Sequence, residues 1–97
     1  MSVPQSRETP RRTIAAEARL KRSGSINYNV HAYDLSERGC RLEFVERPYV
    51  GETVWIKFDK LVPIRSIVRW TGDFAMGIEF ERRMDPRVLE WLLSQLK

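Results

Sequence analysis

The sequence contains little of what membrane-spanning, secreted and metal-binding proteins need. It has one cysteine and one histidine among 97 residues, so an internal disulfide and a cluster of His and Cys metal ligands are both excluded. No apolar run approaches the roughly 20 residues that span a bilayer, and residues 1–10 lack the apolar stretch of a secretory signal peptide. We therefore expect a cytoplasmic protein without a membrane span.

Sequence motifs of common catalytic and nucleotide-binding sites are also missing. The chain has no Gly-rich loop ending in Lys-Ser/Thr and no dinucleotide-binding fingerprint. His31 falls on the polar face of a predicted strand, where we interpret it as an exposed bystander. Cys40 alternates in phase with Leu42 and Phe44, which favours a small buried side chain over a nucleophile. We predict that the protein is not an enzyme and has no catalytic residue, metal site or cofactor.

The positive charge is concentrated near the N-terminus. The formal net charge is +4, with six basic and two acidic residues in residues 1–22 and 11 of each in residues 23–97. This asymmetry indicates an anionic ligand that meets the N-terminal segment. A barrel that binds single-stranded nucleic acid needs aromatic side chains on a basic face, whereas most of this chain is electrically balanced. We expect no DNA or RNA partner.

Alternating apolar residues predict six short strands separated by turn residues. The apolar positions of these strands are Ile14, Ala16, Ala18 and Leu20; Ile26, Tyr28, Val30 and Ala32; Cys40, Leu42 and Phe44; Val54, Ile56 and Phe58; those within Ile64–Trp70; and Phe74, Met76, Ile78 and Phe80. Short strands at such close spacing are typical of a small antiparallel barrel. The predicted fold class is therefore mainly β, a six-stranded antiparallel β-barrel.

Both ends of the chain depart from this alternation. Asp85 is predicted to cap a C-terminal helix with Pro86 at its first position, and the helix is expected to cover a barrel opening or one sheet face. Its apolar stripe consists of Val88, Leu89, Leu92, Leu93 and Leu96. Residues 1–13 have two prolines and no apolar periodicity, so we predict a flexible N-terminal arm attached to one domain over residues 14–97.

The predicted arm contains the first candidate binding motif. Arg7 and Arg11 are four residues apart, and Arg12 adjoins them. A guanidinium group matches two phosphate oxygens at once and can stack on an aromatic base. In an extended segment the two arginines reach up to ~13 Å apart, enough to hold two parts of one ligand. The alternative is a solvated basic tail.

The second candidate motif is Asp34-x-Ser36-x-x-Gly39, between two predicted strands. An ionised Asp can accept two hydrogen bonds from the Watson–Crick edge of guanine, and Ser36 adds a rotatable hydroxyl. Gly39 permits either a positive φ or a close backbone approach. The alternative is an ordinary tight turn, which uses the same residue types to bond its own backbone.

In this order and spacing, the two motifs resemble those of the PilZ domain family, bacterial receptors for the second messenger cyclic di-GMP. The likeness extends from Arg7 to about Leu96 and includes the segments Pro48–Glu52, Ile67–Trp70 and Met76–Phe80. The family fold is a six-stranded antiparallel barrel with a C-terminal helix, in agreement with the periodicity.

The resemblance implies a ligand site. Arg7 and Arg11 would hold the phosphates and stack on or bond to guanine, and the arm would wrap over the bound ligand. Asp34, Ser36 and Gly39 would surround one guanine on the barrel surface. Four further residues are second-tier candidates. Arg12 would act through its charge, and Trp70 is either a stacking surface or a core residue. Arg38 and Arg41 are either solvated groups or extensions of the basic site.

The function expected from this resemblance is a cyclic di-GMP receptor that changes conformation and signals to an effector protein in trans. Three alternatives stay open. A protein–protein adaptor of the same fold would not bind the nucleotide, and a single-stranded nucleic-acid binder would use the barrel surface. A cyclic-nucleotide phosphodiesterase would need a metal-ligand cluster that the spacing of carboxylates and histidines does not provide.

Overall fold

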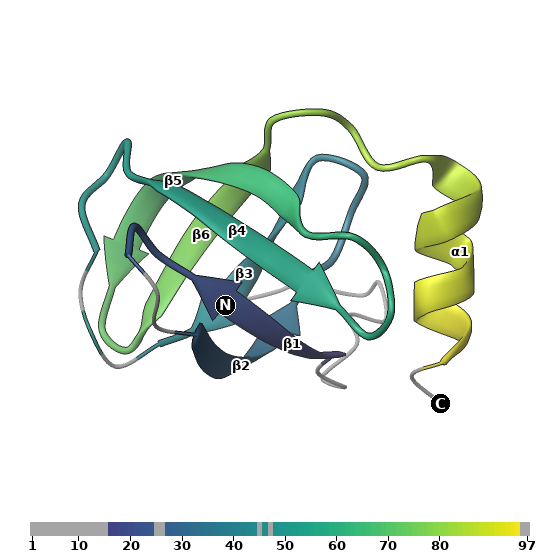
Figure 1. Cartoon of the computed structure of the whole chain (residues 1–97), viewed down its shortest axis with the longest axis horizontal. Helices are drawn as coiled ribbons and strands as arrows, with labels where there is room; N and C mark the ends of the chain where they lie inside the picture. The colour runs from purple at the N-terminus through teal and green to yellow at the C-terminus, as the bar shows by residue number, and fades with distance from the viewer. Residues whose placement is uncertain (1–15, 25–26, 45, 47, 96–97) are drawn as a thin grey trace, which may run out of the picture.

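A computed structural model of the chain describes residues 16–24, 27–44, 46 and 48–95. It contains six strands and one helix (Figure 1): β1 Ala16–Lys21, β2 Asn27–Tyr33, β3 Gly39–Glu43, β4 Thr53–Phe58, β5 Ile64–Gly72, β6 Ala75–Phe80 and α1 Pro86–Ser94. The strands close into a barrel in the order β1-β2-β3-β6-β5-β4, and every neighbouring pair is antiparallel. The predicted fold class is confirmed.

The barrel interior is filled by the alternating apolar side chains of the six strands. β1 alternates strictly between buried and exposed residues, and β4 buries every second residue, as expected where one face of a strand meets the core. The fully buried side chains include Leu20, Leu42, Ile56, Phe58 and Met76. This packed interior leaves the outer face of the sheet as the surface on which a ligand can bind.

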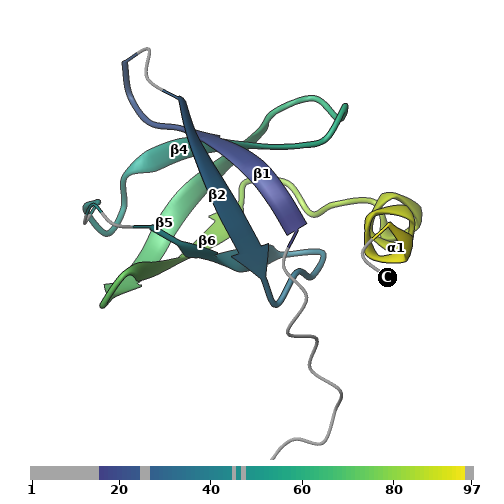
Figure 2. The same ribbon diagram turned by 90° about the horizontal axis from the view of Figure 1, so that it is seen from below.

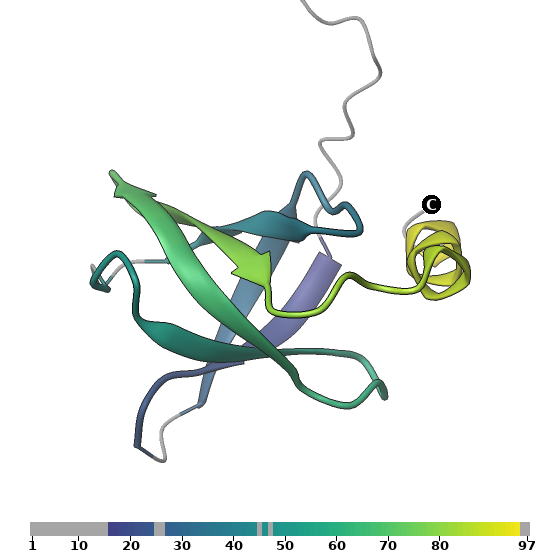
Figure 3. The ribbon, with the colours of Figure 1, turned by 90° about the horizontal axis from the view of Figure 1, so that it is seen from above.

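The C-terminal helix begins as the sequence predicts. The Asp85 side chain accepts a hydrogen bond from the backbone N–H of Arg87, and Pro86 occupies the first helical turn. Figures 2 and 3 place α1 to one side of the barrel, beyond the connection that leaves β6. Leu92 is buried, and Val88 and Leu89 are partly buried against the core. In the part of the chain that the structure describes, no helix is long and apolar enough to cross a membrane.

Two apolar residues assigned to the core lie on the surface instead. Phe74 is 70% exposed and Leu93 is 42% exposed. Phe74 belongs to the two-residue turn between β5 and β6, where Gly72 pairs with Ala75, so it cannot follow the phase of Met76. Leu93 lies outside the narrow face of α1 that meets the barrel. The expectations for residues 1–13, Ile14, Ile26 and Leu96 fall outside the described residues.

Candidate functional site

The turn between β2 and β3 carries the Asp34-x-Ser36-x-x-Gly39 motif. Asp34 follows the last residue of β2 and has a φ of 55°, a left-handed conformation that Asp tolerates better than most residues. Ser36 binds within the turn: its backbone N–H donates to the Gly39 carbonyl at 2.9 Å, its hydroxyl donates to the same oxygen at 3.3 Å, and its Oγ accepts from the Arg38 N–H at 3.2 Å. Ser36 therefore stabilises the turn, and its side-chain oxygen keeps one lone pair for a ligand.

Gly39 is required for a close backbone approach rather than for a positive φ. It pairs with Glu79 at the start of β3, and a Cβ at this position would overlap the carbonyl oxygen of Ile78. The Phe80 N–H also donates to the Arg38 carbonyl at 2.7 Å. The absence of a side chain at residue 39 thus lets the turn lie directly against β6.

Trp70 reaches the same surface because of an irregularity in β5. Val68 pairs with Ile78 and Trp70 pairs with Gly77, so Arg69 is the extra residue of a β-bulge. Val68 is fully buried, whereas Trp70 is 44% exposed. Its indole ring lies across Gly77, where a Cβ would overlap Trp70 Nε1. The core alternative for Trp70 is therefore wrong, and the ring provides a flat aromatic surface on the outside of the barrel.

These elements enclose one open pocket of about 350 Å³ on the outer face. Its lining consists of Asp34, Ser36, Arg38, Gly39, Cys40, Arg41, Trp70, Ile78 and Glu79. The structure thus brings together all four predicted ligand residues that it describes. The pocket combines two carboxylates, a hydroxyl, two guanidinium groups and an indole ring, which are the kinds of group that bind a nucleobase by its edge and its face.

Cys40 forms part of the floor of this pocket and is chemically inert. Its side chain is buried, and burial raises the pKa of the thiol to about 12, with a smaller contribution from the charge of Asp34. Since only the thiolate is a good nucleophile, Cys40 remains a protonated, apolar group at neutral pH. The sequence-based assignment of Cys40 as a small buried side chain is confirmed.

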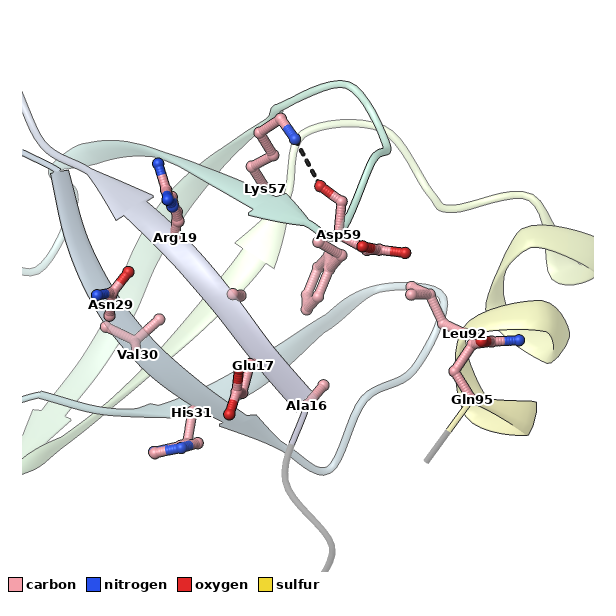
Figure 4. Close-up of a pocket in the computed structure, with 12 residues that line it drawn as sticks. Ala16, Glu17, Arg19, Asn29, Val30, His31, Lys57, Asp59, Leu92 and Gln95 are labelled. Atoms are coloured by element: carbon pink, nitrogen blue, oxygen red, sulfur yellow. Dashed lines mark hydrogen bonds between the residues drawn. The ribbon is translucent and has the colours of Figure 1, made fainter. Parts of the chain in front are cut away.

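A larger groove lies between the barrel and α1 (Figure 4), with a volume of about 920 Å³. Side chains from β1, β2, β4 and α1 surround it, including those of Arg19, His31 and Leu92, together with Asp59, which follows β4. Acidic, basic and apolar groups are mixed here, and the described members of the two motifs do not contribute to its lining. We therefore place the candidate site at the smaller pocket, where the complementary groups for one kind of ligand converge.

Two residues that contact side chains of the pocket were not identified from the sequence. Gly77 supports the indole ring of Trp70, and Tyr33 contacts Arg41, whose guanidinium carbon lies 5.1 Å from the centre of the Tyr33 ring. Both roles depend on which strands pair and in which register. Arg7, Arg11 and Arg12 lie outside the described residues, so their part in the site stays a prediction. Within the described chain, no group of three or more His, Cys, Asp or Glu residues is arranged to hold a metal ion.

The position of Trp70 can be tested by replacing Gly77 with alanine. Because the new methyl group would overlap the indole ring, we expect Gly77→Ala to displace Trp70 and shift its indole N–H resonance in NMR spectra. The ring is half-exposed and can move without opening the core, so the free energy of unfolding should stay within about 1 kcal/mol of the wild-type value.

Gly72→Ala is the matched control, because its Cβ would lie 3.7 Å from Trp70 Cζ3, an ordinary contact distance. The Trp70 resonance should remain in place in this variant. An unshifted resonance in Gly77→Ala would mean that the ring does not rest on Gly77.

Comparison with protein families gives a match over nearly all of the chain. The family model of the PilZ domain matches residues 5–97. This range includes both motifs and all described strands. A search of curated proteins gives no match to the chain.

Proposed function

Because the chain belongs to the PilZ domain family, we propose that it is a cyclic di-GMP receptor that signals to an effector protein in trans and has no catalytic activity of its own. The observation that carries the proposal is the joint presence of Asp34, Ser36, Gly39 and Trp70 at one pocket. The proposed ligand is bound without a cofactor, and the response is a change of surface rather than a reaction.

Several described residues of the pocket suit the binding of a guanine. The carboxylate of Asp34 can accept hydrogen bonds from the N–H groups of the base edge. The exposed face of Trp70 can stack on the ring, a contact that contributes about 1–3 kcal/mol per base in nucleic-acid complexes. Gly39 lets the turn that carries Asp34 and Ser36 lie close against β6. One guanine of a cyclic dinucleotide can therefore bind in the pocket while its phosphates point away from the barrel.

The two arginines that line the pocket are balanced by the carboxylates of Asp34 and Glu79, so the phosphates require further positive groups. We propose that Arg7 and Arg11 provide them, with Arg12 adding to the attraction. Fixing an arm residue in one conformation costs ~1–2 kcal/mol, and charge-assisted hydrogen bonds of ~1.5–3 kcal/mol each offset this cost. The ordered arm would then present a new surface to the effector. This coupling between ligand and arm is the proposed signalling mechanism.

Isothermal titration calorimetry of the purified protein with cyclic di-GMP tests the proposed function, with cyclic di-AMP and GTP as controls. Saturable binding of cyclic di-GMP at micromolar or lower concentration, without binding of the controls, is the expected result. A missing heat signal calls for NMR titration, since enthalpy can vanish by compensation. Absence of binding in both experiments would contradict the receptor function and favour a protein–protein adaptor.

Asp34→Ala tests the guanine-binding role of this carboxylate. We expect it to weaken binding of cyclic di-GMP by about tenfold, equivalent to ~1.4 kcal/mol, because the N–H groups of the base lose their acceptor. Any weak binding of cyclic di-AMP would depend on contacts to its phosphates, so the affinity for this nucleotide should change much less in Asp34→Ala. An equal loss for both nucleotides in parallel titrations would show that Asp34 does not recognise guanine.

A further inference from the structure

Arg41 contacts both the carboxylate of Asp34 and the ring of Tyr33 on the outer face of the barrel. Its Nε is 3.4 Å from Asp34 Oδ2, and its guanidinium carbon is 5.1 Å from the centre of the Tyr33 ring. The side chains of Arg41 and Asp34 are 47% and 34% exposed, and both line the candidate pocket. A ligand can therefore reach both groups at the same time.

The strand register holds Arg41 beside the other groups of the pocket. Arg41 is opposite Tyr33 in the β2–β3 ladder and opposite Gly77 in the β3–β6 ladder. Since Trp70 covers Gly77, Arg41 is placed between the aromatic surface on one side and Asp34 on the other. Hydrogen bonding to the neighbouring Glu43 carboxylate raises the pKa of the Tyr33 phenol.

A carboxylate next to a guanidinium matches one base edge in particular. Along guanine, the N–H donors at N2 and N1 are followed by the acceptors O6 and N7. Asp34 can accept from the two donors, and an adjacent arginine can donate to the two acceptors, which is the commonest specific contact between a protein and guanine. Adenine presents an amino group where guanine has O6, so it would place a donor against the arginine.

We propose that Arg41 is a specificity-determining residue that donates hydrogen bonds to O6 and N7 of the guanine held by Asp34. The inference rests on the proposed function, since it names a second contact at the same site. Before the ligand binds, the ion pair keeps Asp34 and Arg41 side by side. When guanine binds, the Asp34 carboxylate and the Arg41 guanidinium each replace part of their ion pair with hydrogen bonds to the base edge. Adenine then mismatches Asp34 at one position and Arg41 at another.

The test compares cyclic di-GMP with an analogue in which carbon replaces N7 of both guanines. We expect the wild-type protein to bind the analogue about tenfold more weakly than cyclic di-GMP. Arg41→Ala should bind cyclic di-GMP about tenfold or more weakly than the wild type does. Its affinities for cyclic di-GMP and for the analogue should differ by two- to threefold at most. Arg41→Lys keeps the charge without the planar fork, so it should also lose most of its preference for the N7-containing ligand.

Arg65→Ala is the control for removing a positive charge, because Arg65 is an exposed residue of β5 paired with Glu81 at 3.7 Å and does not line the pocket. Its affinity for both ligands should equal that of the wild type. If wild-type protein binds cyclic di-GMP but treats both ligands alike, or if Arg41→Ala retains the full preference, the role of Arg41 is wrong while the receptor function stands. If wild-type protein does not bind cyclic di-GMP, both proposals fail.

Discussion

Arg11→Ala is expected to weaken cyclic di-GMP binding at least tenfold, and Arg7→Ala by a similar factor. A tenfold loss corresponds to ~1.4 kcal/mol, less than the ~1.5–3 kcal/mol of one hydrogen bond to a charged group. The ligand carries two phosphates, and residues 1–22 hold the whole net charge of +4. Loss of either guanidinium therefore removes both a directed contact and part of the long-range attraction.

Calorimetric titration at two salt concentrations measures this effect. Arg87→Ala is a suitable control, because its side chain is 90% exposed and its removal changes the net charge by the same amount. This variant should bind cyclic di-GMP as the wild type does. If Arg7→Ala and Arg11→Ala both keep wild-type affinity, the N-terminal segment has no part in the binding site.

Gly39→Ala is expected to destabilise the fold as well as the site. A Cβ on residue 39 would overlap the backbone oxygen of Ile78, and a backbone atom cannot rotate away as a side chain can. The β3–β6 ladder would have to separate at Gly39 and Glu79, and the 2.7 Å hydrogen bond between Phe80 and Arg38 would be strained with it. Forcing atoms into a packed region costs about 1–3 kcal/mol or more. For a domain of this size, we expect the Tm to fall on the order of 10 °C.

Thermal unfolding followed by circular dichroism checks this expectation. Gly72→Ala makes the same chemical change in β5, where the nearest atom to the new Cβ would be 3.7 Å away, and its Tm should stay close to that of the wild type. Equal Tm values for Gly39→Ala, Gly72→Ala and wild type would show that the turn does not need a glycine. Ligand titrations of Gly39→Ala are meaningful only below its unfolding transition.

The barrel itself could be predicted from the sequence because its strands obey a simple period. In β1 and β4 every second residue is buried, so the apolar pattern reports the inner face directly. The helix could be predicted in the same way, because the capping carboxylate of Asp85 and the following Pro86 act locally. Phe74 was misassigned since a residue in a tight turn no longer follows the phase of the strand beside it.

The candidate site was predictable only in part. Asp34, Ser36 and Gly39 are close in sequence and remain close in the folded turn, so this motif could be recognised from the sequence. From the sequence, Gly39 could serve either a positive φ or a close backbone approach. The tertiary structure shows that the reason is a close approach, because the backbone of β6 lies where a Cβ of residue 39 would be. Such a contact joins residues 39 positions apart, which no local pattern reports.

The amino-acid sequence by itself determined the number of strands, the inner face of those without a bulge, the start of the helix and the turn motif Asp34-x-Ser36-x-x-Gly39, because each depends on neighbours within a few residues. Only the tertiary structure placed Trp70 beside that turn. Ile64–Trp70 would continue with Trp70 on the same face as the buried Val68, but the bulge at Arg69 reverses the phase. One extra residue in a pattern of period two moves every later side chain to the opposite face. The pairing of β5 with β6 sets that bulge, and the pairings of β2, β3 and β6 bring Arg41, Asp34 and Trp70 to one surface.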